Sequence, residues 1–322
     1  MKVAIVYHYY EFNETYRDNY IFFMNCALDS KADFYVMISG DCSVPEIIKD
    51  NIKYVYVDNK NHDFGGVCEF VSYYGNLKYD YYLFVNSSMR GPFLPSYYSK
   101  SWYRVFTDRL NTRIAIVGSS INILPISSPL SAIFSKKFNY NPPFVHVQTT
   151  AYAITGAAFD FLKKLGFYDQ FDKLAKPEIV SDYELRLSQE ILNNGWSISS
   201  ILPTFEEYRQ VGDISNITDE ITSGDPLYKY AFFDRCISPV ESLFVKTNRN
   251  MIEKSDLDSF TCTSLMVSLN NRKLDNNGKN LLEKTIKAIR ESNERRKLVR
   301  IKELKKLNSL CYRIYRKIKN VI

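Results

Sequence analysis

The sequence lacks the short motifs that mark several common enzyme classes. No G-x-G-x-x-G follows the first apolar run and no G-x-x-x-x-G-K-[ST] occurs, which excludes the simplest dinucleotide-binding and P-loop sites. A G-x-S-x-G elbow is also missing. The only histidines are His8, His62 and His146, too few to favour a histidine-based zinc site or a Ser-His-Asp triad. We therefore expect neither a zinc enzyme nor a serine hydrolase.

The sequence also lacks features of secreted and membrane-spanning proteins. Its six cysteines are scattered without a C-x-x-C pair, so we expect reduced thiols, as in the cytoplasm. No run approaches the ~20 consecutive apolar residues that span a bilayer. The first residues, MKVAIVYHYY, carry no small-residue cleavage site, so we expect no signal peptide. These absences predict a cytoplasmic protein.

What the chain does have is enough apolar sequence for a large core and an uneven distribution of charge. It has 322 residues, of which 45% are hydrophobic. Residues 284–320 contain 14 Lys and Arg against three Glu, which leaves 28 basic and 33 acidic residues in the rest of the chain. The body is therefore mildly acidic and the C-terminal tail strongly basic.

The basic tail has the pattern of an amphipathic helix, which we expect over residues 281–320. It contains no Pro or Gly between 284 and 320, and apolar residues recur at spacings of three and four at Leu304, Leu307, Cys311, Ile314, Ile318 and Val321. Such a helix can lie on an anionic membrane surface, pair with a second copy in a homo-oligomer, or bind nucleic acid. The regular stripe argues against nucleic acid. We favour the membrane, since each basic residue near anionic lipid contributes about 1 kcal/mol.

The order of predicted elements indicates an α/β fold with a mostly parallel sheet flanked by helices. The expected strands are 3–7, 34–39, 54–57, 81–85, 114–117, 146–154 and 196–202. The expected helices are 18–28, 44–50, 67–74, 157–165 and 182–193. Residues 205–230 are polar and interrupted by Gly and Pro, which predicts a mobile loop.

The stretch YDYYLFVNSSMRGP, residues 79–92, predicts a binding site. Its apolar run has the composition of a buried strand, and Asn86, Ser87 and Ser88 follow where that strand ends. Ligands of open α/β sheets bind at the carboxyl ends of strands. Arg90 offers a permanent cation whose fork suits phosphate oxygens. The alternative is that Asn86 and Ser88 cap a turn while Arg90 pairs with a surface carboxylate.

Several segments within residues 1–250 resemble the GT-A glycosyltransferases, and more narrowly those of bacterial capsule, O-antigen and lipopolysaccharide biosynthesis. The resemblance rests on N-x-x-H-D-F-G-G, YDYYLFVNSSMRGPFLP, VGSSIN, HVQTTAYAITGAAFDFL and SDYELRLSQEILNNGWSISSILP. It implies a GT-A-like, Rossmann-like catalytic domain over 1–250, with a nucleotide-sugar donor half at 1–125 and an acceptor half at 126–250. Residues 251–322 then form a helical extension that carries the basic helix.

The resemblance also implies what the enzyme does and where. It implies a hexosyltransferase-like enzyme that moves a sugar from a nucleotide-sugar donor to an oligosaccharide or lipid-linked acceptor. Together with the basic helix, this predicts a cytoplasmic protein that is peripheral at the inner face of the cytoplasmic membrane.

One departure from the resemblance concerns the metal. In GT-A enzymes the strand that matches YDYYLFV usually ends in Asp-x-Asp, which holds a divalent ion on the donor diphosphate. Here Asn86, Ser87 and Ser88 supply no charge, and Mg²⁺ is usually held through at least one carboxylate. We therefore predict no essential metal, leave Mg²⁺ or Mn²⁺ open, and predict that Arg90 balances the diphosphate instead.

Further donor-binding residues follow from the resemblance. Asp63 would contact the nucleoside or the sugar, and Gly65 and Gly66 would let the backbone approach the ligand closely. His8 is a donor-side candidate by its position one residue past the predicted first strand. The alternative for the HDFGG segment is a helix N-cap at Asp63 followed by turn glycines.

In the acceptor half, the resemblance places a general base near the start of a helix, where Asp182 and Glu184 stand. We prefer Glu184 as the base and Asp182 as the helix cap; alternatively both only stabilise the helix dipole. Gln148 and Thr149, with neighbouring hydroxyls, could bind acceptor sugars on a strand or simply mark its edge. Glu241 and Lys246 in SPVESLFVKTNR extend the resemblance without an assigned role.

Two other functions stay open. A sugar nucleotidyltransferase would need a Gly-rich basic phosphate loop after the first strand, where HYYEFNETYRD stands instead. A catalytically inactive GT-A-like scaffold subunit is favoured by the missing Asp-x-Asp.

Overall fold

The protein folds around a mixed, mostly parallel sheet, as the sequence predicts. The computed structural model describes residues 1–124, 126–169, 172–202, 204 and 225–319, with side chains up to residue 306 in the last helix. Seven strands form the central sheet in the order β10-β6-β9-β4-β1-β2-β3, in which β9 alone runs antiparallel to its neighbours. The strands are β1 Val3–Tyr10, β2 Asp33–Ser39, β3 Ile52–Val57, β4 Tyr81–Asn86, β6 Ile114–Gly118, β9 Ala151–Thr155 and β10 Ser197–Ser200.

Two small antiparallel pairs stand beside this sheet. In one, β5 (Met89–Arg90) pairs with β11 (Val245–Lys246), so a segment from late in the chain joins the chain just after β4. In the other, β7 (Ile121–Leu124) pairs with β8 (Phe144–Val147). The first pair brings Lys246 next to the segment that follows β4.

Helices cover the sheet. In chain order they are α1 Glu14–Cys26, α2 His62–Tyr74, α3 Arg104–Thr107, α4 Pro129–Phe138, α5 Gly156–Lys164, α6 Lys176–Ile179, the π-helix η1 Val180–Leu185, α7 Arg186–Asn193, α8 Pro239–Ser242, α9 Lys254–Asn270 and α10 Asn276–Lys319. Helix α2 contacts β1 and β2, α5 contacts β4, β6 and β9, and α7 contacts β6 and β10. Asn13 caps α1, since its side chain accepts from the N–H of Tyr16 at 3.2 Å.

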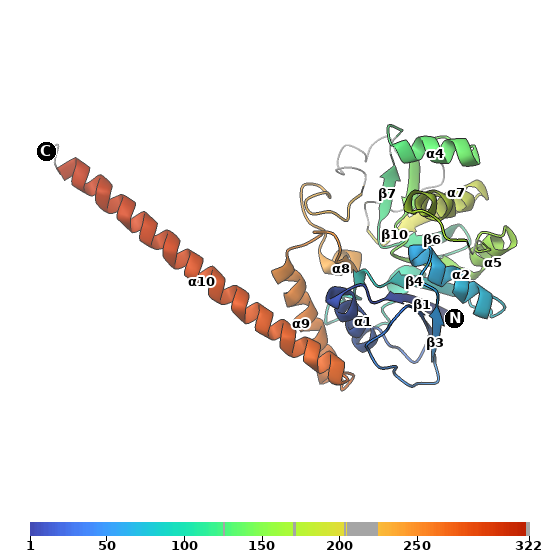
Figure 1. The fold of residues 1–322 in the computed structure, drawn as a ribbon, viewed down its shortest axis with the longest axis horizontal. Helices are drawn as coiled ribbons and strands as arrows, with labels where there is room; N and C mark the ends of the chain where they lie inside the picture. The colour runs from blue at the N-terminus through green and yellow to red at the C-terminus, as the bar shows by residue number, and fades with distance from the viewer. Residues whose placement is uncertain (125, 170–171, 203, 205–224, 320–322) are drawn as a thin grey trace.

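Helix α9 and the first turns of α10 pack against the body of the protein and contribute side chains to its apolar core. Helix α9 lies beside the start of α10, and both contact α1. Leu265, Leu281 and Leu282 are buried in the same apolar cluster as the sheet. Beyond them α10 runs away from the body as a long rod (Figure 1), along which Leu298 and Leu304 are more than half exposed. The expected helix over 281–320 is thus present from Asn276 to Lys319.

No helix in the described ranges is both long and apolar enough to cross a membrane. The expected loop at 205–230 lies mostly outside the described residues.

Three expectations about local structure are wrong. Residues 44–50 form no helix, because the N–H of Ile47 is bound by the hydroxyl of Tyr54 in β3 at 2.8 Å rather than by a helical carbonyl. Residues 146–154 form two strands in different sheets, separated by a turn at 148–150. The helical run that contains Asp182 begins at Lys176, so Asp182 is no helix cap.

Candidate functional site

A cavity of about 1090 Å³ opens where the strand order reverses. The chain runs outward from β1 to β2 and β3, then returns to place β4 on the other side of β1, and the cavity lies at the carboxyl ends of β1 and β4. This is the topological switch point at which open α/β sheets bind ligands. The lining includes His8 and Tyr10 of β1, Ser87 and Ser88 after β4, and parts of segments 59–63, 173–184, 228–229 and 246–250.

Asp63 connects the two central strands at the cavity wall. His8 of β1 and Asn86 of β4 are register partners, so they lie side by side. The carboxylate of Asp63 accepts from the amide of Asn86 at 2.5 Å, and its main-chain oxygen lies 3.1 Å from Nδ1 of His8. Asn86 therefore holds the Asp63 carboxylate in place at the cavity, whereas the sequence suggested that Asn86 itself binds the donor.

His8 lies within β1, not one residue past it, and both of its ring nitrogens are in use. A carbonyl only accepts, so Nδ1 carries the proton and Nε2 accepts from the hydroxyl of Ser39 at 2.6 Å. Burial lowers the pKa of His8, with the Asp63 charge opposing it, so the ring is neutral at pH 7. His8 thus contributes a wall to the cavity and fixes Asp63.

Gly65 and Gly66 lie close to other residues of the protein and do not face the cavity. A Cβ on Gly65 would lie 1.9 Å from the carbonyl oxygen of Lys60, and one on Gly66 would lie 2.5 Å from the ring of His8. Both glycines are buried in the first turns of α2. Gly66 lets this helix pack against His8 of β1, and Gly65 makes room for the preceding segment at Lys60. The described lining of the large cavity includes neither glycine.

The side chains of Glu184 and Asp182 lie in different surroundings in the structure. Glu184 lines the cavity from the π-helix η1, a rare geometry that recurs at functional sites. Asp182 instead forms an ion pair with Lys137 at 2.6 Å. Burial raises the pKa of the Glu184 carboxyl, with Lys246 opposing the shift and Asp63 adding to it. Among the described residues the Glu184 side chain has no hydrogen-bond partner.

Lys246 is the buried cation of the cavity. It is 9% exposed, and burial, followed by the nearby Arg249, lowers its pKa, while Asp63, Glu184 and Asp225 oppose that shift. Within the described ranges no acid lies in ion-pair distance of Lys246. No role for Lys246 could be predicted from the sequence, because only the pairing of β11 with β5 brings it here.

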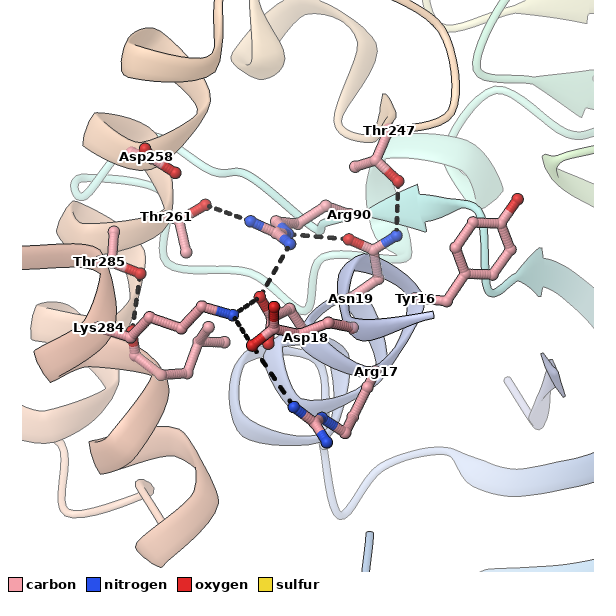
Figure 2. Close-up of polar contacts among 12 residues, drawn as sticks. Tyr16, Arg17, Asp18, Asn19, Arg90, Thr247, Asp258, Thr261, Lys284 and Thr285 are labelled. Carbon is pink, nitrogen blue, oxygen red and sulfur yellow. Dashed lines mark hydrogen bonds and ion pairs between the residues drawn. The ribbon is translucent and has the colours of Figure 1, made fainter. Parts of the chain in front are cut away.

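Arg90, the cation that the sequence predicted for the diphosphate, faces the other way. Its Nε donates to Asn19 at 2.9 Å, and its guanidinium lies 3.9 Å from Asp18 and 3.5 Å from the hydroxyl of Thr261 (Figure 2). Only 5% of Arg90 is exposed, and the lining of the large cavity does not include it. Its position therefore does not fit contact with a diphosphate beside Ser88.

The two predicted acceptor residues lie in the turn between β8 and β9. Gln148 is buried and donates to Asp225 at 3.2 Å, and Thr149 is also buried. Of this segment, the lining of the large cavity includes Thr150 alone, whose buried hydroxyl has no partner among the described residues. The carbonyl of Ser120 fixes the turn by accepting from the N–H of Gln148 at 3.0 Å.

Three aromatic side chains that the sequence did not single out line one part of the cavity. Tyr10, Phe12 and Tyr16 all line it. The rings of Tyr10 and Phe12 lie 6.2 Å apart, and those of Phe12 and Tyr16 lie 5.8 Å apart. Phe12 is 65% exposed, which leaves a face of the group open to a planar ligand.

The strand end that holds a metal in GT-A enzymes does not fit one here. The side-chain oxygen of Asn86 accepts from the N–H and the hydroxyl of Ser88 at 3.0 and 2.6 Å, and its amide is bound to Asp63. These atoms are committed to each other and present no shared set of oxygens to a cation. Within the part of the chain that the structure describes, no group of three or more His, Cys, Asp or Glu is placed to hold a metal ion. Metal independence stays a prediction.

Comparison with known proteins adds little. No protein-family model matches the sequence, and no curated protein matches it. Among solved structures, the chain is similar to an active-site mutant of LgtC, with a TM-score of 0.32 and 9% identity over 56% of this chain and 69% of that one. It is also similar to the galactosyltransferase LgtC in complex with donor and acceptor sugar analogs, with a TM-score of 0.29 and 10% identity over 56% and 70%. Similarity at this level does not establish a shared fold.

Proposed function

We propose that the protein is a glycosyltransferase of GT-A-like architecture that binds a nucleotide-sugar donor in the large cavity. The observation that carries the proposal is the placement of two groups of opposite charge, the partly buried Glu184 and the buried Lys246, in a cavity at the sheet's switch point. Neither has a hydrogen-bond or ion-pair partner in the described chain. Buried ionisable groups with shifted pKa values that face a cleft are typical of catalytic sites.

The donor would be held by groups of three kinds. Lys246 and Arg249 would neutralise the diphosphate, with charge-assisted hydrogen bonds that replace the metal. The aromatic group of Tyr10, Phe12 and Tyr16 would stack on the base. Asp63, fixed by Asn86, would accept hydrogen bonds from hydroxyls of the ribose or the sugar.

In the proposed reaction, a hydroxyl oxygen of the acceptor attacks the anomeric carbon of the donor sugar. The bond from that carbon to the diphosphate oxygen breaks, and its electron pair leaves with the nucleoside diphosphate. Glu184 takes the hydroxyl proton as general base, which its raised pKa favours because a base works best when its pKa lies near the operating pH. Lys246 stabilises the charge that grows on the leaving oxygen.

More specifically, the proposed enzyme is a hexosyltransferase of bacterial capsule, O-antigen or lipopolysaccharide synthesis that acts on a lipid-linked acceptor. Its support is the motif resemblance together with the basic helix α10, which would hold the enzyme at the anionic inner face of the cytoplasmic membrane.

A thermal-shift screen tests the proposal, with UDP, GDP, CMP and dTDP and their sugars, each in Mn²⁺ and in EDTA. We expect nucleotides of one base to stabilise the protein in EDTA. We also expect the protein to hydrolyse the matching nucleotide sugar slowly, with water in place of the acceptor. Stabilisation only with Mn²⁺ would contradict the metal-free donor site. Pyrophosphate-dependent release of a nucleoside triphosphate would indicate a nucleotidyltransferase, and no binding would indicate a scaffold.

A further inference from the structure

A second cavity, of about 550 Å³, adjoins the first at the foot of α10. The two cavities share Lys229, Lys246, Arg249 and Asn250 in their linings, so they are neighbours across these residues. The other walls of the second cavity come from α1, α9 and α10, including Thr15, Leu257 and Ala288. Its volume is within the ~300–1,000 Å³ of ordinary small-molecule pockets.

The carboxylates that line this second cavity are all neutralised by neighbouring lysines. Lys284 bonds Glu14 at 2.8 Å and Asp18 at 2.6 Å (Figure 2). In α9, Lys254 bonds Asp258 at 2.7 Å.

The fourth carboxylate of the lining, that of Glu253, is paired with Lys229. Paired charges of this kind offer acceptor oxygens and N–H donors side by side, which suits the hydroxyls of a sugar. The lining therefore suits a hydroxyl-rich ligand that can hydrogen-bond to both members of these ion pairs.

The buried network around Arg90 makes the wall of this cavity rigid. Arg90 lines it and joins α1, through Asn19 and Asp18, to Thr261 of α9. Asn19 in turn donates to Thr247, just after β11, at 2.8 Å (Figure 2). Helix α1, helix α9 and the segment after β11, which are far apart in the sequence, are thereby held together around the second cavity.

We propose that this second cavity binds the saccharide chain of the acceptor and presents its terminal hydroxyl past Lys246 to the donor in the first cavity. The inference rests on the proposed glycosyl transfer, and the bonds made and broken are those given above, with the proton passing to Glu184. Because α10 forms one wall of this cavity and then continues as the long basic helix, an acceptor on an anionic membrane would arrive at the same end of the molecule.

The test fills the second cavity from two sides without touching the first. Ala288→Trp acts from α10 and Thr15→Trp acts from the exposed rim of α1, and neither position lines the donor cavity. Lys287→Trp is the matched control, since Lys287 is exposed and lies outside both described linings. The probes are octyl glycosides of common hexoses and N-acetylhexosamines, with and without a diphosphate before the alkyl chain. Binding, transfer and donor hydrolysis by water are measured for each variant.

We expect Ala288→Trp and Thr15→Trp to raise the KM for the acceptor by about tenfold or more, the loss of one decade of affinity. Donor hydrolysis, which needs the first cavity alone, should match that of Lys287→Trp. Unchanged transfer in both filled variants would overturn the inference, as would a wild-type protein that hydrolyses donor but binds no probe. Loss of the proposed function itself would look different, since the wild-type protein would then neither bind nor hydrolyse any nucleotide sugar.

Discussion

The Nε of Arg90 donates a hydrogen bond to the side-chain oxygen of Asn19 over 2.9 Å, although the two residues are 71 positions apart. Asn19 uses its amide at the same time to bind the carbonyl of Ser87 at 2.9 Å and the hydroxyl of Thr247 at 2.8 Å. Because Ser87 follows β4 and Thr247 follows β11, one buried side chain ties the end of the central strand to the segment that supplies Lys246. Asn19 therefore supports the large cavity without lining it.

Asn19→Ala should reduce stability and leave the chemistry in place. The change leaves Arg90, Ser87 and Thr247 short of partners in a buried setting, which costs about 1–3 kcal/mol for an unsatisfied group. Urea denaturation measures the loss. The exposed neighbour Thr15→Ala serves as control, and equal stability of the two variants would contradict the bridging role.

Lys246→Met should weaken binding of nucleoside diphosphates far more than binding of the free nucleoside. The change removes a charged hydrogen-bond donor, worth roughly 1.5–3 kcal/mol, so we expect about a tenfold to hundredfold rise in Kd for the diphosphate. Calorimetry with both ligands gives the ratio of the Kd for the nucleoside to the Kd for the nucleoside diphosphate. Arg90→Met, which removes a cation outside the cavity, should leave that ratio at its wild-type value, and the opposite pattern would restore Arg90 as the diphosphate ligand.

Glu184→Gln should lower kcat by about 10²–10⁴, the usual contribution of a general base, with little change in donor Kd. The wild-type rate should fall as pH decreases through the Glu184 pKa, since the protonated carboxyl accepts no proton. Burial raises that pKa, so the decline should begin above the ordinary 4.5 of a glutamate. Asp182→Asn is the control, because Asp182 is paired with Lys137, and a large loss there would argue against Glu184.

His146 should make the fold sensitive to mild acid. Burial lowers the pKa of His146 to about 4, against the opposing charge of Asp225. The unfolded chain takes up the proton near the ordinary 6.5, so stability present above that pH is lost as pH falls toward 4, by roughly 3 kcal/mol at most. His146→Gln should flatten this dependence in urea denaturation at several pH values. An equally steep profile in the variant would locate the acid sensitivity elsewhere.

Removal of residues 290–322 should abolish sedimentation with anionic vesicles and preserve donor hydrolysis. The cut leaves Leu281, Leu282 and Thr285 buried at the foot of α10, so the body keeps its core. A milder variant, in which Lys302, Lys305 and Lys306 become Gln, should weaken sedimentation in part, since each basic residue near the membrane contributes about 1 kcal/mol. Unchanged sedimentation together with a lower mass in light scattering would identify α10 as an oligomerisation helix.

Local sequence patterns were sufficient for much of the fold. β-branched and aromatic runs predicted the central strands, and the absence of Pro and Gly from the basic tail predicted a long helix, now seen from Asn276 to Lys319. The end of YDYYLFVNSS was predicted as a binding edge, and the large cavity lies there. These features depend on neighbours within a few residues, so the sequence alone determined them.

The tertiary structure decided which side chains face the cavity. Lys246 reaches it only because β11 pairs with β5, more than 150 positions earlier in the chain. Arg90, one register position away in that pairing, is bound instead to Asn19 and Asp18 of α1 and does not line the large cavity. Likewise, the π-helical turn directs Glu184 into the cavity and leaves Asp182 to Lys137. The sequence determined most of the elements and the edge of the sheet at which the large cavity lies. Long-range pairing, which local patterns do not encode, selected the charged side chains that line this cavity.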